Sequence, residues 1–179
     1  MYMDRWHPGP PLSESWIRGT SLLAQPRLEF DFIAKAITTW DGTPVGTIRA
    51  KRVPRRIQWS HTYVDLRGAA VLRTHHSGWT VWGPHRCMDV AGQLVGVARW
   101  RDCRVNGVVV AWNCQRKAAR VSYSVAGVEL ASVSPGPWSR WSRHRRWRLE
   151  VQPWVDAATR LMLMTMPEIC DGVEGVGDD

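Results

Sequence analysis

The sequence predicts a mostly β protein, a closed antiparallel β-barrel of about 12 strands around a central hydrophobic helix near the C-terminus. Three observations predict it: strand-like alternation that begins at Leu28, hairpin turns that recur along the chain, and one apolar segment at residues 153–166. Residues Leu161 to Met164 are consecutive and apolar, so their side chains point all round a helix axis. Such a helix needs enclosure on every side, and the preceding strands can supply it.

The N-terminal residues and the first strand differ in composition. Residues 1–24 mix proline with serine and glycine, which favours an irregular arm. From residue 27 onward Leu28, Phe30 and Phe32 alternate with charged residues, the period of two expected for a strand with one buried face. We therefore expect a single barrel domain at residues 25–171, followed by an acidic tail at residues 172–179.

Glycine-bearing turns separate the following strands. Aspartate accepts backbone hydrogen bonds in tight turns, and glycine adopts the positive φ that branched residues avoid. The candidate turns are Asp41-Gly42, Asp65 to Gly68, Asp89 to Gly92, Ala126-Gly127 and Asn106-Gly107. About five hairpins suit a closed barrel, which has no free edges. A β-propeller, with longer and more uniform repeats, is the alternative. We expect positive φ at Gly42, Gly68 and Gly92.

The C-terminal segment carries a family resemblance. Val151-x-Pro153-x-Val155-Asp156, an apolar helix and then Glu168-Ile169 resemble the C-terminal signature of LURP-one-related proteins. These proteins belong to the tubby-like superfamily, which also includes phospholipid scramblases. The resemblance covers roughly residues 28–171 as a pattern of elements and about a dozen C-terminal positions residue by residue. It implies a closed barrel around a central helix, expected at residues 156–166.

The chain departs from this family pattern in three respects. Pro167 stands where it would break or kink the helix. The strand segments carry more tryptophan and arginine than the family pattern leads one to expect. The calcium dependence reported for scramblases is not carried over, because the acidic residues near the C-terminus lack the alternating spacing of a calcium loop.

Composition indicates one domain with a strongly basic surface. The 179 residues are 44% hydrophobic, enough for one core. The net charge is +8, and 21 of the 24 basic residues are arginine, which either phosphate binding or genome composition explains. The four cysteines form no CxxC pair, and no secretory leader or membrane-spanning run is evident. A cytoplasmic setting, including a peripheral position on a membrane, is therefore favoured.

Two basic clusters are the candidate binding sites. Residues 138–148 interleave five arginines with three tryptophans, which suits phosphate oxygens and an interface or a base. The alternative is a solvated loop entering a strand, with Trp141 and Trp147 turned to the core. Residues 49–56 form a second cluster, expected on a loop around Pro54. The expected ligand-binding residues are Trp138, Arg140, Trp141, Arg143, Arg145, Arg146, Arg148, Lys51, Arg52, Arg55 and Arg56.

Metal and catalytic motifs are not found in the sequence. His75-His76 and His85-x-Cys87 do not form a recognisable zinc set, and there is no P-loop, Gly-x-Ser-x-Gly or dinucleotide fingerprint. Catalysis and a cofactor are disfavoured, although His61, Asp65 and Asp89 could meet in space. We expect a non-catalytic module that binds phospholipid head groups or a membrane surface. The resemblance to tubby-like and scramblase-like proteins agrees with this expectation, because tubby-like barrels include phosphoinositide binders. Nucleic-acid binding and a purely structural or regulatory barrel are the alternatives.

Overall fold

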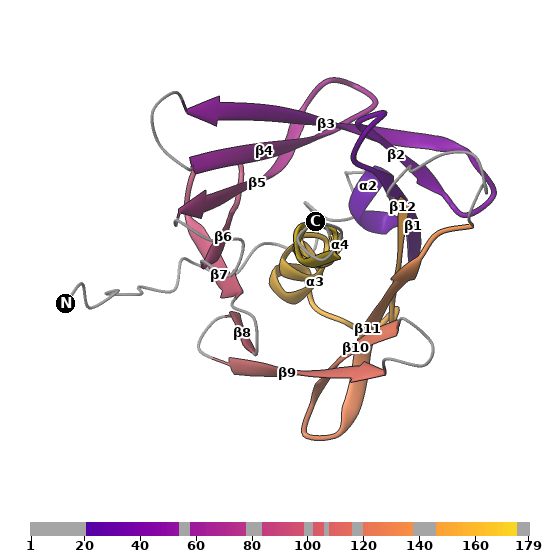
Figure 1. Ribbon diagram of the computed structural model, residues 1–179, viewed down its shortest axis with the longest axis vertical. Coiled ribbons are helices and arrows are strands. Elements are labelled where there is room, and N and C mark those ends of the chain that lie inside the picture. Colours follow the sequence, from indigo (N-terminus) through magenta and orange to yellow (C-terminus); the bar gives the residue numbers. More distant parts are fainter. Residues whose placement is uncertain are drawn as a thin grey trace.

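The computed structural model describes residues 21–53, 58–77, 84–98, 102–105, 108–115, 120–137 and 146–174 (Figure 1). Within them lie twelve strands and three helices. The strands are β1 Arg27–Asp31, β2 Ala36–Thr39, β3 Pro44–Val53, β4 Gln58–Asp65, β5 Ala70–Ser77, β6 His85–Met88, β7 Leu94–Ala98, β8 Asp102–Val105, β9 Val108–Gln115, β10 Arg120–Val125, β11 Val128–Pro135 and β12 Arg146–Val151. The helices are α2 Ser21–Ala24, α3 Ala157–Leu163 and α4 Met166–Glu174.

Every strand pairs antiparallel with its neighbours in sequence, and β1 pairs with β12 as well as with β2. The hydrogen-bonded order therefore runs through all twelve strands and returns to β1, as in a closed barrel. The prediction of a mostly β, antiparallel protein is confirmed. Figure 1 shows α3 and α4 in the middle of the ring of strands.

Four of the predicted hairpin turns have the expected backbone. Gly42, Gly68 and Gly92 have φ values of 89°, 82° and 81°, which confirms the prediction, and Gly127 follows with 80°. The aspartates act as anticipated, since Asp65 Oδ1 accepts hydrogen bonds from the backbone N–H groups of residues 67 and 69. Residues 106–107 lie outside the described residues, but β8 and β9, which flank them, pair antiparallel with Val105 opposite Val108.

The central helix is buried as predicted. Leu161 and Leu163 are 0% exposed and Met164 is 1% exposed, so side chains all round this helix lie in the core. Asp156 caps the N-terminus of α3 by accepting the backbone N–H of Thr159. Burial on every side follows from the consecutive apolar residues, because strands surround the axis.

The single helix expected at residues 156–166 is wrong, because the chain forms two helices. α3 ends at Leu163, a turn at residues 164–165 follows, and α4 begins at Met166. Pro167 has no N–H, and its ring would clash with the carbonyl of Leu163 in a continuous helix. Proline is tolerated in the first turn of a new helix, where it stands here. α4 extends to Glu174, so the predicted acidic tail beginning at residue 172 is also wrong for residues 172–174.

The predicted irregular arm is wrong for its last four residues. Ser21–Ala24 form α2, whose Leu22 and Leu23 are 0% and 1% exposed. The buried Arg160 of α3 donates from Nη1 to the carbonyl oxygen of Leu23 at 3.1 Å and so ties α2 to α3. Two adjacent leucines provide enough apolar surface to bury, which the Pro, Ser and Gly content of the preceding residues obscured. Residues 1–20 lie outside the described residues.

Candidate functional site

The two ends of the barrel differ in the segments that join their strands. Because neighbouring strands are antiparallel, all odd-numbered strands finish, and all even-numbered strands begin, at the same end. We call this end the Arg/Trp end; it includes Asp31 of β1, Val53 of β3 and Arg146 of β12. The opposite end carries the turns at Asp41, Asp65 and Asp89, and we call it the Asp-turn end.

Both predicted basic clusters border the Arg/Trp end. The strands that flank residues 54–57 and 138–145 have their adjoining ends there. These two segments, with residues 78–83, 99–101 and 116–119, lie outside the described residues, and so do the predicted site residues Arg55, Arg56, Trp138, Arg140, Trp141, Arg143 and Arg145. In sequence, the five segments contain five tryptophans and no Asp or Glu. Their nine basic residues are Arg55, Arg56, Arg99, Arg101, Arg116, Lys117, Arg140, Arg143 and Arg145.

The cluster at residues 49–56 is not wholly a loop. Residues 49–53 continue β3, where Lys51 lies opposite Ser60 and Arg52 lies opposite Trp59. The loop interpretation is therefore wrong for these five residues, because β3 and β4 extend their pairing to Val53 and Gln58. Lys51 is exposed, on a strand that leads toward the Arg/Trp end.

Arg146 and Arg148 lie in ion pairs between β1 and β12, which we call the β1–β12 seam. Arg148 Nε lies 2.9 Å from Glu29 Oε2, and Arg146 Nε lies 3.1 Å from Asp31 Oδ2. Each pair joins residues directly opposite in the register. The two arginines were predicted to bind a ligand, but their charge already balances β1 carboxylates, and they form part of the barrel wall.

The seam also contains an aromatic ring between two cations. The guanidinium groups of Arg27 and Arg148 both lie 5.1 Å from the centroid of the Trp40 ring. Trp40 Nε1 donates to the carbonyl oxygen of Leu28, and Arg27 Nε lies 2.8 Å from Glu150 Oε1. The side chains therefore tie together the first and last strands of the barrel.

Trp147 points to the interior, as one interpretation of the Arg and Trp run anticipated. It is 4% exposed, and its Nε1 donates to Asp171 Oδ1 of α4 at 3.2 Å. The alternating seam residues face outward while Trp147 and Leu149 face the core, which is the ordinary period of a strand. Residues 146–148 of the run therefore serve the wall of the barrel.

A buried polar cluster surrounds Glu168 of α4. Its carboxylate lies 2.8 Å from His61 Nδ1, and it accepts hydrogen bonds from Tyr63 Oη at 3.0 Å and Thr74 Oγ1 at 2.9 Å. His85 Nδ1 lies 3.9 Å away. We call these five residues the Glu168 cluster. It joins α4 to β4, β5 and β6 inside the barrel.

The Glu168 cluster holds a charged pair. Burial alone would raise the pKa of Glu168, but the hydrogen bond and positive charge of His61, with His85 and Thr74, lower it overall. Burial alone would lower the pKa of His61, but its hydrogen bond to Glu168 and the charge of that carboxylate raise it overall. At pH values between the lowered pKa of Glu168 and the raised pKa of His61, a carboxylate and an imidazolium therefore face each other. Burial, followed by the nearby Glu168 charge, raises the pKa of Tyr63 and keeps this phenol neutral.

Sequence reasoning considered His61 with Asp65 and Asp89, considered His85 with Cys87, and used Glu168 only within the family resemblance. A signal for the cluster did exist, because Glu168 interrupts the apolar neighbours Met166, Ile169 and Cys170. A carboxylate amid apolar helix residues requires a buried partner. Across the described part of the chain, no group of three or more His, Cys, Asp or Glu side chains has the geometry to hold a metal ion.

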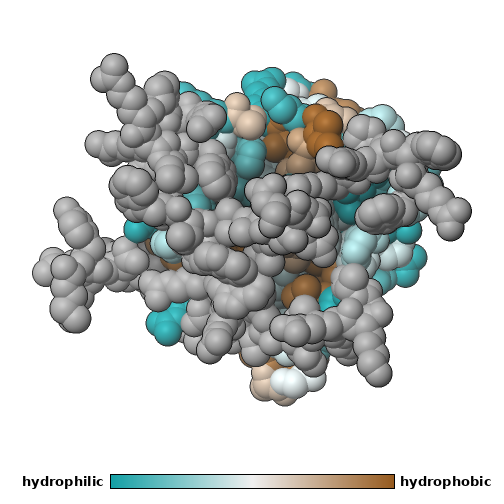
Figure 2. Space-filling view, in the orientation of Figure 1, coloured by the Kyte–Doolittle hydropathy of each residue, from teal (hydrophilic) through white to brown (hydrophobic). Residues whose placement is uncertain are grey.

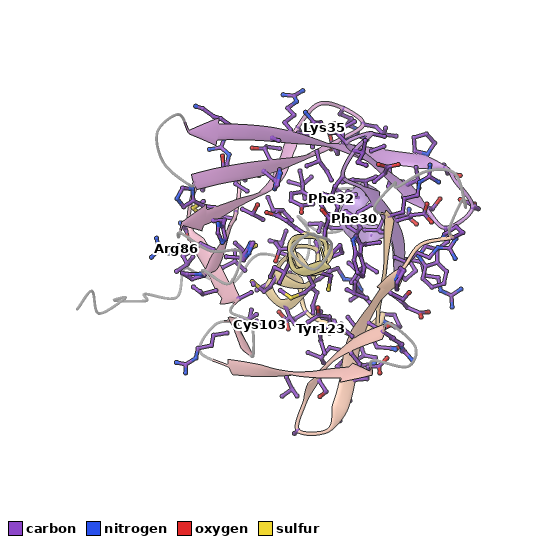
Figure 3. All side chains as sticks on the ribbon, in the orientation of Figure 1. Phe30, Phe32, Lys35, Arg86, Cys103 and Tyr123 are labelled. Atoms are coloured by element: carbon purple, nitrogen blue, oxygen red, sulfur yellow. The ribbon has the colours of Figure 1, made fainter. Side chains whose placement is uncertain are left out.

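Figure 3 shows Phe30 and Phe32 directed toward the central helices and Lys35 farther out on the β1–β2 turn.

None of the helices in the described residues is long and apolar enough to span a bilayer. No protein-family model matches the chain, and no curated protein or solved structure is significantly similar to it. The geometry and charge of the barrel are therefore the basis for a functional proposal.

Proposed function

We propose that the chain is a tubby-like, non-catalytic module that binds anionic phospholipid head groups at a membrane surface through the Arg/Trp end. One observation carries this proposal: the antiparallel order brings the strand ends that border both basic clusters to the same end of the barrel. The strand order, which returns to β1, and the buried α3 support the resemblance to the tubby-like superfamily. That superfamily includes phosphoinositide binders and scramblases.

The charge of the Arg/Trp end favours an anionic membrane as its partner. The segments joining its strands have nine basic residues and no acidic ones in sequence, and Lys35 and Lys51 add to that charge. Near an anionic bilayer each exposed basic residue contributes about 1 kcal/mol. The Asp-turn end instead carries three aspartates, Asp41, Asp89 and Asp156, and one arginine, Arg67, in its connections. An anionic membrane would therefore orient the barrel with its Arg/Trp end toward the lipid.

Tryptophan favours lipid over nucleic acid as the partner. Five tryptophans occur in the same segments as the basic residues. Indole rings favour the head-group region of a bilayer, where one side of the ring is apolar and the N–H stays hydrated. Bases can also stack on indoles, so nucleic acid remains the competitor that the experiment must include.

The test compares two triple variants of equal charge. Arg140, Arg143 and Arg145 are replaced by Gln in one protein; Arg67, Arg73 and Arg104, exposed residues of the wall and the Asp-turn end, are replaced in the other. Sedimentation is measured with phosphatidylcholine vesicles with and without phosphatidylserine, at two salt concentrations. We expect the parent and the second variant to bind anionic vesicles in a salt-sensitive manner. The first variant should bind more weakly by about 3 kcal/mol at low salt.

Three outcomes would contradict the proposal. The first is a parent protein that sediments equally with neutral and anionic vesicles. The second is an equal loss of binding in both variants, which would indicate a dependence on net charge rather than on the Arg/Trp end. The third is tighter, salt-sensitive binding of the parent to single- or double-stranded nucleic acid than to lipid, which would assign the same surface to nucleic acid.

A further inference from the structure

The β1–β2 turn presents an apolar tip at the Arg/Trp end. The turn comprises residues 32–35, and Ile33, Ala34 and Lys35 are exposed in succession. The Ile33 residue is 55% exposed. In the region of the view where Figure 3 labels Lys35, Figure 2 shows hydrophobic surface beside hydrophilic surface. The tip therefore combines one large apolar residue with one cation.

The turn is held rigidly from beneath. Asp31 Oδ1 accepts hydrogen bonds from the backbone N–H groups of Ile33 at 3.0 Å and Ala34 at 2.8 Å. The other carboxylate oxygen of Asp31 is bound by Arg146 of the seam. The carbonyl oxygen of Lys35 accepts the N–H of Ile48 on β3 at 3.0 Å. The exposed position of Ile33 is thus set by hydrogen bonds to two neighbouring strands.

Two further features of the β1–β2 turn are its aromatic packing and its backbone conformation. Phe32 turns inward and lies 6.3 Å from the Phe30 ring and 6.4 Å from the His61 ring, which leaves Ile33 to face outward. Lys35 adopts a φ of 56°, a left-handed conformation that glycine or asparagine would adopt at lower cost. Ala126 adopts a similar φ of 49° in the β10–β11 turn, so the conformation sets the shape of the turn and the charge of Lys35 is a separate feature.

The remaining exposed large hydrophobic residues of the described chain lie at the other end of the barrel. They are Leu66, Val90, Val128 and Trp154. Leu66 and Val90 stand in turns beside Asp65 and Asp89. Negative charge in the connections of that end opposes an anionic bilayer, whereas the cations in the sequences at the Arg/Trp end attract one.

We propose that the β1–β2 turn is the apolar tip of the membrane-binding surface. Ile33 enters the boundary between the head groups and the acyl chains of a bilayer containing anionic phospholipid, and Lys35 contacts a head-group phosphate. This inference rests on the proposed function and adds the residue that penetrates the bilayer and the cation that contacts a phosphate beside it. Apolar burial adds to electrostatic attraction at a membrane surface, so the two residues act together.

The experiment uses matched changes at the two ends. Ile33→Gln is compared with Leu66→Gln, which alters a 62% exposed side chain in the β4–β5 turn. Binding is measured on phosphatidylcholine vesicles containing phosphatidylserine. The Ile33→Gln variant loses the apolar contact and should bind the vesicles about tenfold more weakly than the parent. The Leu66→Gln variant should bind them as the parent does. Ile33→Phe should retain binding, and all three proteins should melt as the parent does, because both positions are exposed.

A fourth variant separates binding from folding at Lys35. Asparagine tolerates the left-handed conformation, so Lys35→Asn should melt no lower than the parent while its vesicle binding falls about fivefold. If the parent binds anionic vesicles and Ile33→Gln binds equally well, this inference is overturned and the proposed function stands. If Leu66→Gln alone loses binding, the orientation is reversed. If the parent does not bind, both proposals fail.

Discussion

The β1–β12 seam and the Glu168 cluster use the same chemistry in different surroundings. Each pairs carboxylates with nitrogen cations at distances of 2.8 to 3.1 Å in its closest contacts. The seam lies on the outer wall, where the side chain of Arg27 is 58% and that of Arg146 is 44% exposed. The Glu168 side chain is only 5% exposed. Water can replace a lost partner in the seam but not beside Glu168.

The difference in burial assigns different roles to the two networks. Exposed ion pairs contribute little to stability, because water screens them and ordering the side chains costs entropy. The seam therefore acts chiefly by fixing the register. A slip of β1 by one residue would turn its charged side chains inward and away from the arginines of β12. A buried carboxylate without its partners is costly, so the Glu168 cluster holds α4 in one position inside the barrel.

The largest effect should follow removal of the buried carboxylate. Glu168→Ala leaves His61 without its anion and leaves the hydroxyl groups of Tyr63 and Thr74 without their acceptor. We expect the free energy of unfolding to fall by about 3 to 5 kcal/mol. Chemical denaturation of the parent and the variant measures it.

The matched control for this change is Glu129→Ala. Glu129 pairs with Arg120 at 2.7 Å, but its side chain is 40% exposed. The control should lose about 1 kcal/mol or less. Equal losses in Glu168→Ala and Glu129→Ala would show that burial does not distinguish the two kinds of pair and would refute the comparison.

A second prediction concerns pH. The raised pKa of His61 contributes stability that is present below its usual value of 6.5 and is lost as pH rises through the raised value. The lowered pKa of Glu168 contributes stability that is present above 4.5 and is lost as pH falls through the lowered value. The pair should therefore stabilise the fold most between pH 4.5 and 6.5. His85, Lys35 and Asp171 also act on this pair.

The measurement is the difference in unfolding free energy between the parent and His61→Gln at several pH values. The difference should shrink above pH 6.5 as the imidazolium of the parent loses its proton. A difference that stays constant from pH 5 to pH 9 would mean that His61 is neutral throughout and that the pair is not ionic.

A third prediction tests the enclosed helix α3. Leu161→Ala removes a side chain with 0% exposure from the middle of the barrel. We expect a loss of about 2 to 5 kcal/mol, since a close-packed core relaxes only partly around a cavity. A variant that melts within error of the parent would show that the position tolerates a void and that α3 is not tightly enclosed.

Local patterns in the sequence predicted part of this molecule. Alternation identified the strand from Leu28, the aspartate and glycine pairs located the turns, and the consecutive residues around Leu161 indicated a buried helix. Each signal lies within a few residues, where backbone conformation and facing are decided. Pro167 indicated a helix break, although the position of that break depends on how Met164 and Thr165 turn inside the barrel.

Contacts between distant segments were missed. The seam joins residues about 120 positions apart, and nothing local in the run at residues 138–148 shows that Arg148 faces Glu29. A signal did exist, because the alternating charges of residues 27–31 and 146–150 are complementary when the two strands are written antiparallel. The Glu168 cluster similarly joins α4 to three neighbouring strands, in which Tyr63 and Thr74 stand 105 and 94 positions before Glu168.

The smallest effect is expected in the seam, and a double-mutant cycle on Glu29 and Arg148 measures it. Arg148→Gln also loses its contact with the Trp40 ring, so the single change overstates the ion pair. The coupling energy from Glu29→Gln, Arg148→Gln and the double variant isolates the pair and should be about 0.2 to 1 kcal/mol. Added salt should reduce it, because the side chain of Arg148 is 29% exposed, although that of Glu29 is only 12% exposed. A coupling as large as the loss in Glu168→Ala would invert the comparison and make the seam, rather than the interior, the main electrostatic support of the barrel.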